Sequence, residues 1–191
     1  MNDVDTPGAD ARLLNLVGAL AIGVTDRSVG DVALSAGLDA SAAAALVALL
    51  DLARAGSVQR LSQLVGISHS GTVRLVNRLT QSGLVERAPG ADRRSVSVRL
   101  SRRGGALARR IRAQRREAIS DSLQGLTERQ RAELAVICDV VITNLTGDRL
   151  AQRSAGRQPS GGALCRMCDP RECGRADGAC PAAQAAARYG G

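Results

Sequence analysis

The 191-residue chain contains no Phe, no Trp and no Lys, one Tyr and one His. All 26 basic residues are therefore Arg, a bias that we attribute to a GC-rich genome, so arginine in place of lysine carries no recognition signal at any single position. With one histidine, no glycine-rich phosphate loop and no nucleophile elbow, the chain lacks a constellation for acid–base or nucleophilic catalysis. We therefore predict that the protein is not an enzyme.

Long apolar runs are also absent. No stretch of about 18 uninterrupted apolar residues occurs, and the N-terminus is acidic where a secretory signal is basic. We therefore expect a cytoplasmic protein with no membrane partner. The apolar content of 45% is enough to fill the core of one ordinary domain that is followed by a tail.

Positive charge is concentrated in one block. Between Arg54 and Arg116 there are fifteen arginines and two acidic residues, which gives +13, while the rest of the chain carries −5 and restores the formal charge of +8. Such cationic density attracts a polyanion and supplies the sequence-independent part of affinity for nucleic acid. The block therefore indicates DNA or RNA as a partner, with a solvated basic face as the alternative.

Apolar spacing predicts helices before and inside this block. One helix covers residues 13–21, and a second runs from an N-cap at Ser41 to a stop at Gly56. A short third helix ends at Gly66, and Ser68 can cap a fourth that continues to residue 83. Two short helices around a glycine-containing turn are typical of a helix-turn-helix.

The fourth helix has one apolar and one polar face. Its predicted buried face consists of Thr72, Leu75, Val76 and Leu79. Its outward face presents the side chains that we predict to contact DNA, namely His69, Ser70, Val73, Arg74, Asn77 and Arg78. We expect Ser70, Val73 and Arg74 to read base edges, with Val73 against a thymine methyl group and Arg74 against a guanine edge.

Two segments that alternate apolar and polar residues follow at once, at residues 84–87 and 96–100. They flank a long turn that contains Arg93 and Arg94, so the pattern predicts a β-hairpin. A helix-turn-helix followed by a hairpin with arginines at its tip is a winged helix, and such a tip can place arginine in the minor groove. We therefore predict a mainly α-helical fold with a small β-hairpin wing.

These residues resemble the MarR family of bacterial transcriptional regulators. The resemblance is strong over residues 58–104, most specific in the wing segment 92–104, and loose elsewhere within residues 10–147. It implies an obligate homodimer, joined by helices from both ends of the domain, with one winged helix per subunit in successive major grooves of a palindromic operator. It also implies that Asp92 braces the wing and that Arg94, or alternatively Arg93, enters the minor groove.

The function expected from this resemblance is sequence-specific regulation of transcription, as a repressor that an effector or a redox or metal signal releases. A small-molecule effector is therefore a further expected partner, although the aromatic residues with which some relatives line a ligand pocket are not available here. Phosphate contacts are assigned to Arg78, Arg87 and Arg102. The alternative is an architectural or RNA-associated winged-helix protein whose zinc knuckle contacts nucleic acid or a protein.

Two further helices are expected after the wing. Ser101 opens an arginine-rich helix, and a capping box formed by Thr127 and Gln130 opens the last one. The apolar stripe of the last helix suits dimer packing and consists of Leu134, Ile137, Cys138, Val141 and Leu145. The predicted organisation is a disordered N-terminus (1–9), the main domain (10–147) with its DNA-binding lobe (41–104), a flexible linker (148–163), a tail (164–182) and a flexible end (183–191).

Four of the five cysteines lie in the last 27 residues, in the pattern C-x2-C-x4-C-x6-C-P. They are Cys165, Cys168, Cys173 and Cys180. In a reducing compartment such clustering favours metal ligation over disulfides. Four thiolates satisfy Zn²⁺ in a closed structural site, while an iron–sulfur cluster and a thiol–disulfide switch are the alternatives. Because so small a segment has no core of its own, we expect it to be disordered without its metal.

Overall fold

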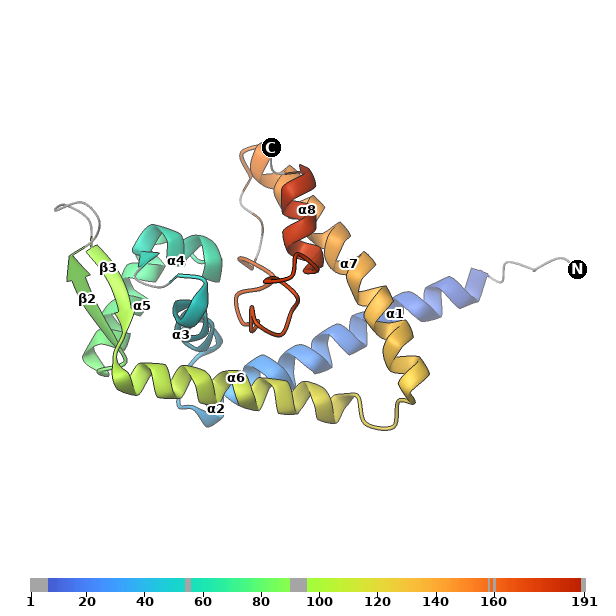
Figure 1. The fold of residues 1–191 in the computed structure, drawn as a ribbon, viewed down its shortest axis with the longest axis horizontal. Helices are drawn as coiled ribbons and strands as arrows, with labels where there is room; N and C mark the ends of the chain where they lie inside the picture. The colour runs from blue at the N-terminus through green and yellow to red at the C-terminus, as the bar shows by residue number, and fades with distance from the viewer. Residues whose placement is uncertain (1–6, 54–55, 90–95, 158, 160, 190–191) are drawn as a thin grey trace, which may run out of the picture.

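The computed structural model describes residues 7–53, 56–89, 96–157, 159 and 161–189. The N-terminal half contains α1 (Pro7–Thr25), the π-helical η1 (Asp26–Asp31), α2 (Val32–Ser35), α3 (Ala40–Asp51), β1 (Gly56–Ser57), α4 (Val58–Val65) and α5 (His69–Gln81). The C-terminal half contains β2 (Val85–Pro89), β3 (Val96–Leu100), α6 (Arg102–Ser122), α7 (Glu128–Ser154) and α8 (Pro181–Tyr189). Figure 1 shows α3 to α5 and the sheet gathered into one lobe, from which α6 runs to the base of α7.

The core of this lobe is built around α3. Eight consecutive residues of α3, from Ala42 to Leu49, are buried, and five of them are alanines that let α4 and α6 approach closely. Leu61 of α4, Val76 of α5 and Ile111 of α6 are fully buried and complete the same core. Burial of these side chains fixes the position of α5 relative to the sheet and to α6.

The wing strands are joined to the start of α6 at a very close approach. Strand β3 lies between β1 and β2, and all pairings are antiparallel, with Val85 opposite Leu100 and Pro89 opposite Val96. A Cβ atom at Gly104 would overlap the carbonyl oxygen of Leu84, so only glycine fits there. Any movement of the first turn of α6 therefore displaces the base of the wing.

Several predicted features are confirmed. Gly66 ends α4 with a φ of 79°, and the Ser68 hydroxyl caps α5 by accepting a hydrogen bond from the amide of Gly71. Ser101 caps α6, and Thr127 and Gln130 form the capping box of α7. The mainly α-helical winged helix-turn-helix fold with a small sheet is therefore correct.

Other predictions about the lobe are wrong. The N-cap of α3 is Asp39 rather than Ser41, because the Asp39 carboxylate accepts a hydrogen bond from the amide of Ala42 at 2.8 Å. This helix ends at Asp51 and does not continue toward Gly56. Strand β1, which pairs Gly56 with Val98, was not predicted because two residues are too few for an alternating pattern.

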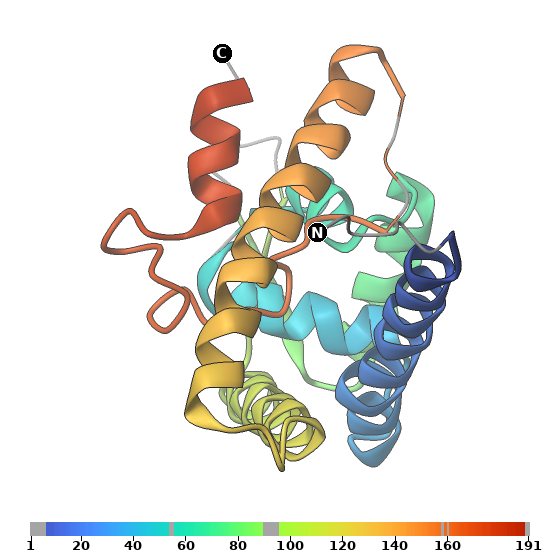
Figure 2. The ribbon, with the colours of Figure 1, turned by 90° about the vertical axis from the view of Figure 1, so that its right-hand side faces the viewer.

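The predicted C-terminal boundaries are also wrong. Helix α7 continues to Ser154, so residues 148–154 are helical where a flexible linker was expected. Residue Ala163 is fixed to the lobe, since its amide donates to the carbonyl of Leu64 at 2.9 Å. Where a flexible end was predicted at 183–191, α8 packs along α7 and buries Ala185 (Figure 2).

The prediction of a disordered N-terminus falls on residues 1–6, outside the described residues, and on residues 7–9, with which α1 begins.

Helix α1 leaves large apolar side chains exposed. Leu14 is 72% exposed and Ile22 is 66% exposed, and the helix extends away from the lobe (Figure 1). Residues 10–35 are long and apolar enough to cross a membrane by length and composition alone, and only 6% of the apolar window is buried. This segment is not an uninterrupted apolar run, because it includes charged residues at several positions.

Candidate nucleic-acid interface

Helix α5 is held firmly beneath its outward face. Thr72, Leu75, Val76 and Leu79 are all buried, as predicted. The turn that precedes α5 is closed by the hydroxyl of Ser62, which donates to the carbonyl of Ile67 at 3.0 Å. The helix-turn-helix therefore presents a rigid surface, on which the outward side chains can be positioned against a groove.

The predicted contact residues of α5 lie on this outward face. His69, Ser70, Arg74, Asn77 and Arg78 are exposed, and Val73 is half-buried. The structure thus brings all six to one surface of the molecule.

Four of these side chains have partners within the chain, of which Ser70 contacts the neighbouring Ser68 hydroxyl at 3.3 Å and the other three contact more distant residues. His69 Nδ1 is 3.2 Å from Gln59 Oε1 of α4, and Asn77 accepts a hydrogen bond from the wing. Arg78 donates to Asp39 Oδ2 at 2.8 Å, so the carboxylate that caps α3 also neutralises part of the positive charge of α5. The role of Asp39 was missed, although an acidic residue two positions before the predicted cap was a usable signal.

Arg74 differs from these residues. It is exposed, and among the described residues no hydrogen bond or ion pair restrains its guanidinium group. Its side chain is therefore available to a ligand without the loss of an internal contact.

Among the described residues, one side-chain hydrogen bond connects the wing to α5. Arg87 of β2 donates from Nη2 to Asn77 Oδ1 at 2.5 Å, which fixes the orientation of both side chains. Arg102 is exposed at the first turn of α6, next to the base of the wing. The wing-tip predictions, Asp92, Arg93 and Arg94, lie outside the described residues.

The sequence and the fold are similar to those of known proteins. The sequence model of the MarR family matches residues 36–95, which span α3 to the wing. A MarR family protein from Bacillus stearothermophilus superimposes with a TM-score of 0.63 at 20% identity, over 74% of this chain and 98% of that one. The fold is that of MarR family proteins.

Other structures with the MarR fold are similar. The apo form of MarR from E. coli gives a TM-score of 0.56 at 22% identity, over 69% of this chain and 95% of that one. CouR from Rhodococcus jostii RHA1, determined with bound p-coumaroyl-CoA, gives 0.50 at 22% identity, over 68% and 88%. No curated protein matches this chain significantly. The four-cysteine tail lies outside the segment that the family model matches.

Beyond the matched segment, α6 is bound to the tail by charge. Arg112 is only 14% exposed and contacts Asp51 of α3 at 2.7 Å and Asp169 of the tail at 3.1 Å. Arg112 therefore bridges two parts of one chain. Sequence reasoning missed this triad because its members are separated by more than fifty residues.

The tail places its four cysteines close to one another and to arginines. All four are free thiols, and Cys180 is buried. Burial raises the pKa of Cys168, and the nearby charge of Arg115 opposes that rise. Burial also raises the pKa of Cys173, and the proximity of Cys180 raises it further. Around the thiols, burial lowers the pKa of Arg166, and Arg149 lowers it further.

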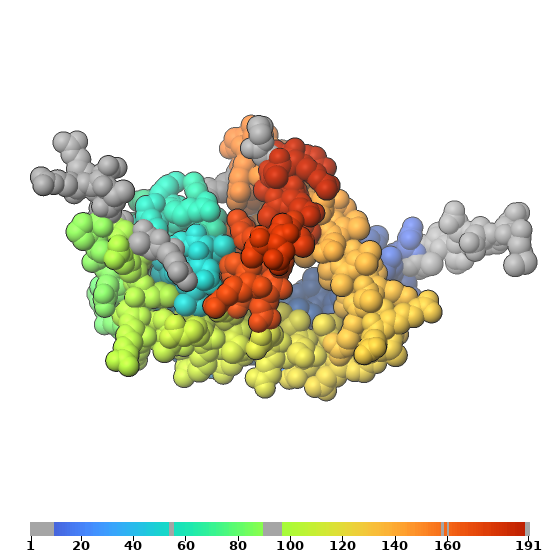
Figure 3. Space-filling view, in the orientation of Figure 1, coloured from blue at the N-terminus to red at the C-terminus, as the bar shows by residue number. Residues whose placement is uncertain are grey.

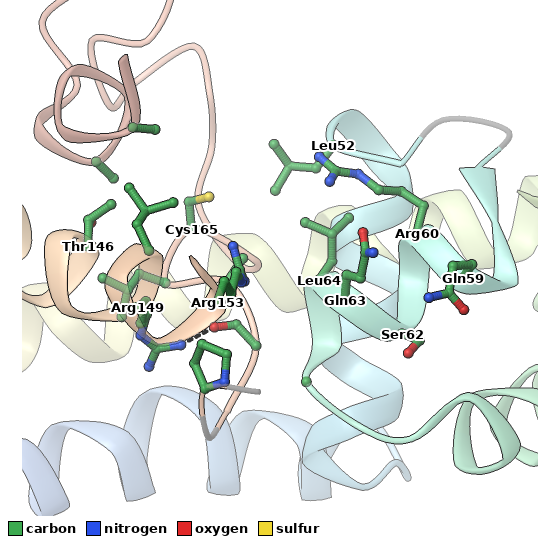
Figure 4. A pocket seen from close by; sticks show the side chains of 18 of the residues that line it. Leu52, Gln59, Arg60, Ser62, Gln63, Leu64, Thr146, Arg149, Arg153 and Cys165 are labelled. Atoms are coloured by element: carbon green, nitrogen blue, oxygen red, sulfur yellow. Dashed lines mark hydrogen bonds between the residues drawn. The ribbon is translucent and has the colours of Figure 1, made fainter. Parts of the chain in front are cut away.

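A cleft of about 740 Å³ separates α4 from α7 and the tail (Figure 4). Arg60 and Gln63 of α4 lie on one side, and Arg149 and Arg153 of α7 lie on the other, close to Cys165. Arg149 donates to the carbonyl of Gly162 across this space. The described residues that line it include five arginines and one histidine but no acidic residue, so its electrostatic character favours an anion.

Proposed function

We propose that the protein is a homodimeric, sequence-specific DNA-binding regulator of transcription that acts as a repressor at a palindromic operator. The observation that carries the proposal is the polar face of α5, which is exposed while its apolar face is fixed in a core shared with the wing and α6. The match of residues 36–95 to the MarR family and the concentration of arginine between residues 54 and 116 support it.

In the proposed complex, α5 occupies the major groove. Arg74, whose guanidinium has no restraining partner among the described residues, reads a guanine edge, and Ser70 and Val73 contact neighbouring bases. Arg87 and Arg102 hold phosphates on either side of the helix, and Arg78 does so by leaving Asp39. Arg94 or Arg93 enters the minor groove.

The proposed dimer covers the exposed apolar faces of α1 and α7. No residue of α7 is buried in the single chain, and five large apolar side chains of this helix are at least 45% exposed. A contiguous apolar surface of that kind in a monomer marks an interaction site. A second copy of this chain is its proposed occupant, because the dimer places two α5 helices for a palindromic site.

The proposed effector is an organic anion that binds in the arginine-lined cleft. The cleft reaches from His69, at the start of α5, to α7, so an anion that draws Arg60 and Arg149 together changes the position of the reading helix. The p-coumaroyl-CoA bound by CouR is a ligand of this charge on the same fold.

Selection of bound fragments from a library of genomic DNA tests the proposal. We expect a palindromic sequence that is bound more tightly than bulk DNA by a factor of ~10³ or more at fixed salt concentration. Equal affinity for all fragments, or a preference for RNA, would instead support the architectural or RNA-associated alternative.

A further inference from the structure

We propose that Cys165, Cys168, Cys173 and Cys180 bind one Zn²⁺ ion, and that this ion fastens the C-terminal tail between the DNA-binding lobe and α7. The zinc site stands independently of the proposed function, whereas its effect on DNA binding rests on that function.

The tail backbone already brings the cysteines together in two pairs. The amide of Cys168 donates to the carbonyl of Cys165 at 3.0 Å, which closes a tight turn around the first pair. In the second pair, the amide of Ala179, next to Cys180, donates to the carbonyl of Gly174, next to Cys173, at 2.8 Å, so the two cysteines lie at the ends of one closed turn. Gly174 has a φ of +70°, which residues with a side chain rarely adopt.

The two pairs do not yet form a complete metal site. Within the described residues, no three Cys, His, Asp or Glu side chains converge on a geometry that could hold a metal. A cavity of about 350 Å³ between α6 and the tail is lined by Cys168 and Cys173, so space exists for one pair to approach the other. In small cysteine sites, binding of the metal and the last step of local folding are one event.

The charges around the cavity favour an anionic centre. Arg115 also lines it, and its buried Nε atom has no hydrogen-bond partner among the described residues. A polar atom that is buried without a hydrogen-bond partner is costly. When four thiols bind Zn²⁺, each S–H bond gives way to a Zn–S bond and four protons pass to solvent, which leaves a centre of charge −2. Arg115 and Arg166 then face that negative charge.

The donor set favours zinc in particular. Four thiolates fill a tetrahedral coordination sphere and leave no open position, which is the arrangement of structural zinc sites. The described backbone already forms the two turns that are needed to place four thiolates around one ion. Zinc also needs no inorganic sulfide, which an iron–sulfur cluster would require.

The proposed zinc centre lies next to residues that contact the DNA-binding lobe. Shortly before Cys165, Gly162 lies against the turn of the helix-turn-helix, so close that a Cβ atom at Gly66 would overlap the Gly162 nitrogen. Met167, between the first two cysteines, is 4% exposed and belongs to the core of the lobe. Immediately after Cys180, α8 begins and packs along α7. Figure 3 shows the tail between the lobe and α7, above α6.

The first experiment measures metal per chain in the full-length protein, purified with a thiol reductant. We expect one zinc per chain in the wild type and in Cys138→Ser, because Cys138 lies on α7 outside the cluster. We expect loss of zinc in Cys168→Ser and in Cys180→Ser. Far-UV circular dichroism that matches the wild type establishes that these variants fold, and Co²⁺ substitution gives a thiolate charge-transfer band only where the site is intact.

Three results would overturn the zinc assignment. They are iron with acid-labile sulfide and visible absorption, a Cys173–Cys180 disulfide in place of metal, and a metal-free chain with five reactive thiols.

The second experiment compares operator binding by zinc-loaded and chelator-stripped protein. We expect stripped protein to bind about tenfold more weakly, within the usual range of coupling between two sites, and readdition of zinc to restore affinity. Unchanged affinity would overturn the coupling to DNA. If zinc is bound and no DNA sequence is preferred, the proposed function fails and the metal site stands. If the protein holds no zinc as purified and takes up none when zinc is added, yet prefers a specific DNA sequence, the metal site fails and the proposed function stands.

Discussion

Arg74 and Arg78 lie about one turn apart on the exposed face of α5, but the protein holds them differently. Arg78 is paired with Asp39, whereas Arg74 has no such partner among the described residues. Arg74 can therefore enter the groove freely, whereas Arg78 must exchange the Asp39 carboxylate for a DNA phosphate.

Arg74→Ala and Arg78→Ala should therefore have different effects on DNA binding. Arg74→Ala should relax sequence preference at one base pair and cost about 1–3 kcal/mol, because a guanine contact is lost. Arg78→Ala should weaken all DNA alike and reduce the salt slope by about 1. Titrations of operator and of mutated operator at several salt concentrations measure both quantities. The opposite pattern would mean that the two roles are exchanged.

Gly104 and Gly105 form a matched pair at the junction of wing and α6. In Gly104→Ala the new methyl group meets the backbone of Leu84, and we expect the free energy of unfolding to fall by about 1–3 kcal/mol. In Gly105→Ala the nearest atom is the flexible end of Arg109 at 3.6 Å, so helix propensity should dominate and stability should rise by up to about 1 kcal/mol. Denaturant unfolding compares the two variants, and equal destabilisation would contradict the close approach.

At the scale of elements, α6 is the helix that joins the lobe to the tail. Its first turn touches the wing, its middle buries Ile111 in the core, and Arg112 joins it to α3 and to the tail.

Arg112→Met should be strongly destabilising. It removes the cation that Asp51 and Asp169 share in a site where all three side chains are less than a quarter exposed, while Asp169 keeps its contact with Arg171, and we expect a loss of about 2 kcal/mol. The control is Arg116→Met, which breaks an ion pair with Glu172 that is mostly exposed and should cost less than about 1 kcal/mol. Thermal unfolding of both variants provides the comparison, and similar losses would mean that the triad contributes little.

At the scale of the whole molecule, a single chain leaves two apolar surfaces exposed. Helix α7 is apolar along one stripe and yet buries nothing, and α1 extends away from the lobe with its leucines exposed. Both observations are accounted for by a second subunit.

Val140→Asp should convert the proposed dimer to monomer. Val140 is 57% exposed on α7, and a carboxylate there would have to be buried in the dimer without a partner. The neighbouring Asp139→Asn changes charge at an exposed polar position and should leave the dimer intact. Sedimentation velocity distinguishes the two states. A wild-type chain that sediments as a monomer, or that floats with lipid vesicles through α1, would contradict a second subunit as the occupant.

The sequence determined those features that depend on local spacing. Gly66, Ser68, Ser101 and Thr127 end or begin helices through contacts within a few residues, and period-3.6 and period-2 patterns located α5 and the wing. Because the outward face of a helix follows from its buried face, the outward residues of α5 could also be predicted.

Tertiary structure decided what depends on distant partners. The pairing of Arg78 with Asp39, the triad around Arg112 and the contact of Gly162 with Gly66 each join positions that share no periodicity. The segment 148–163 has the composition of a linker, yet residues 148–154 belong to α7, and Gly162 and Ala163 pack on the lobe, because burial of Met167 and the charge of Arg112 outweigh local preference. Local propensities are weak compared with the burial that long-range packing supplies.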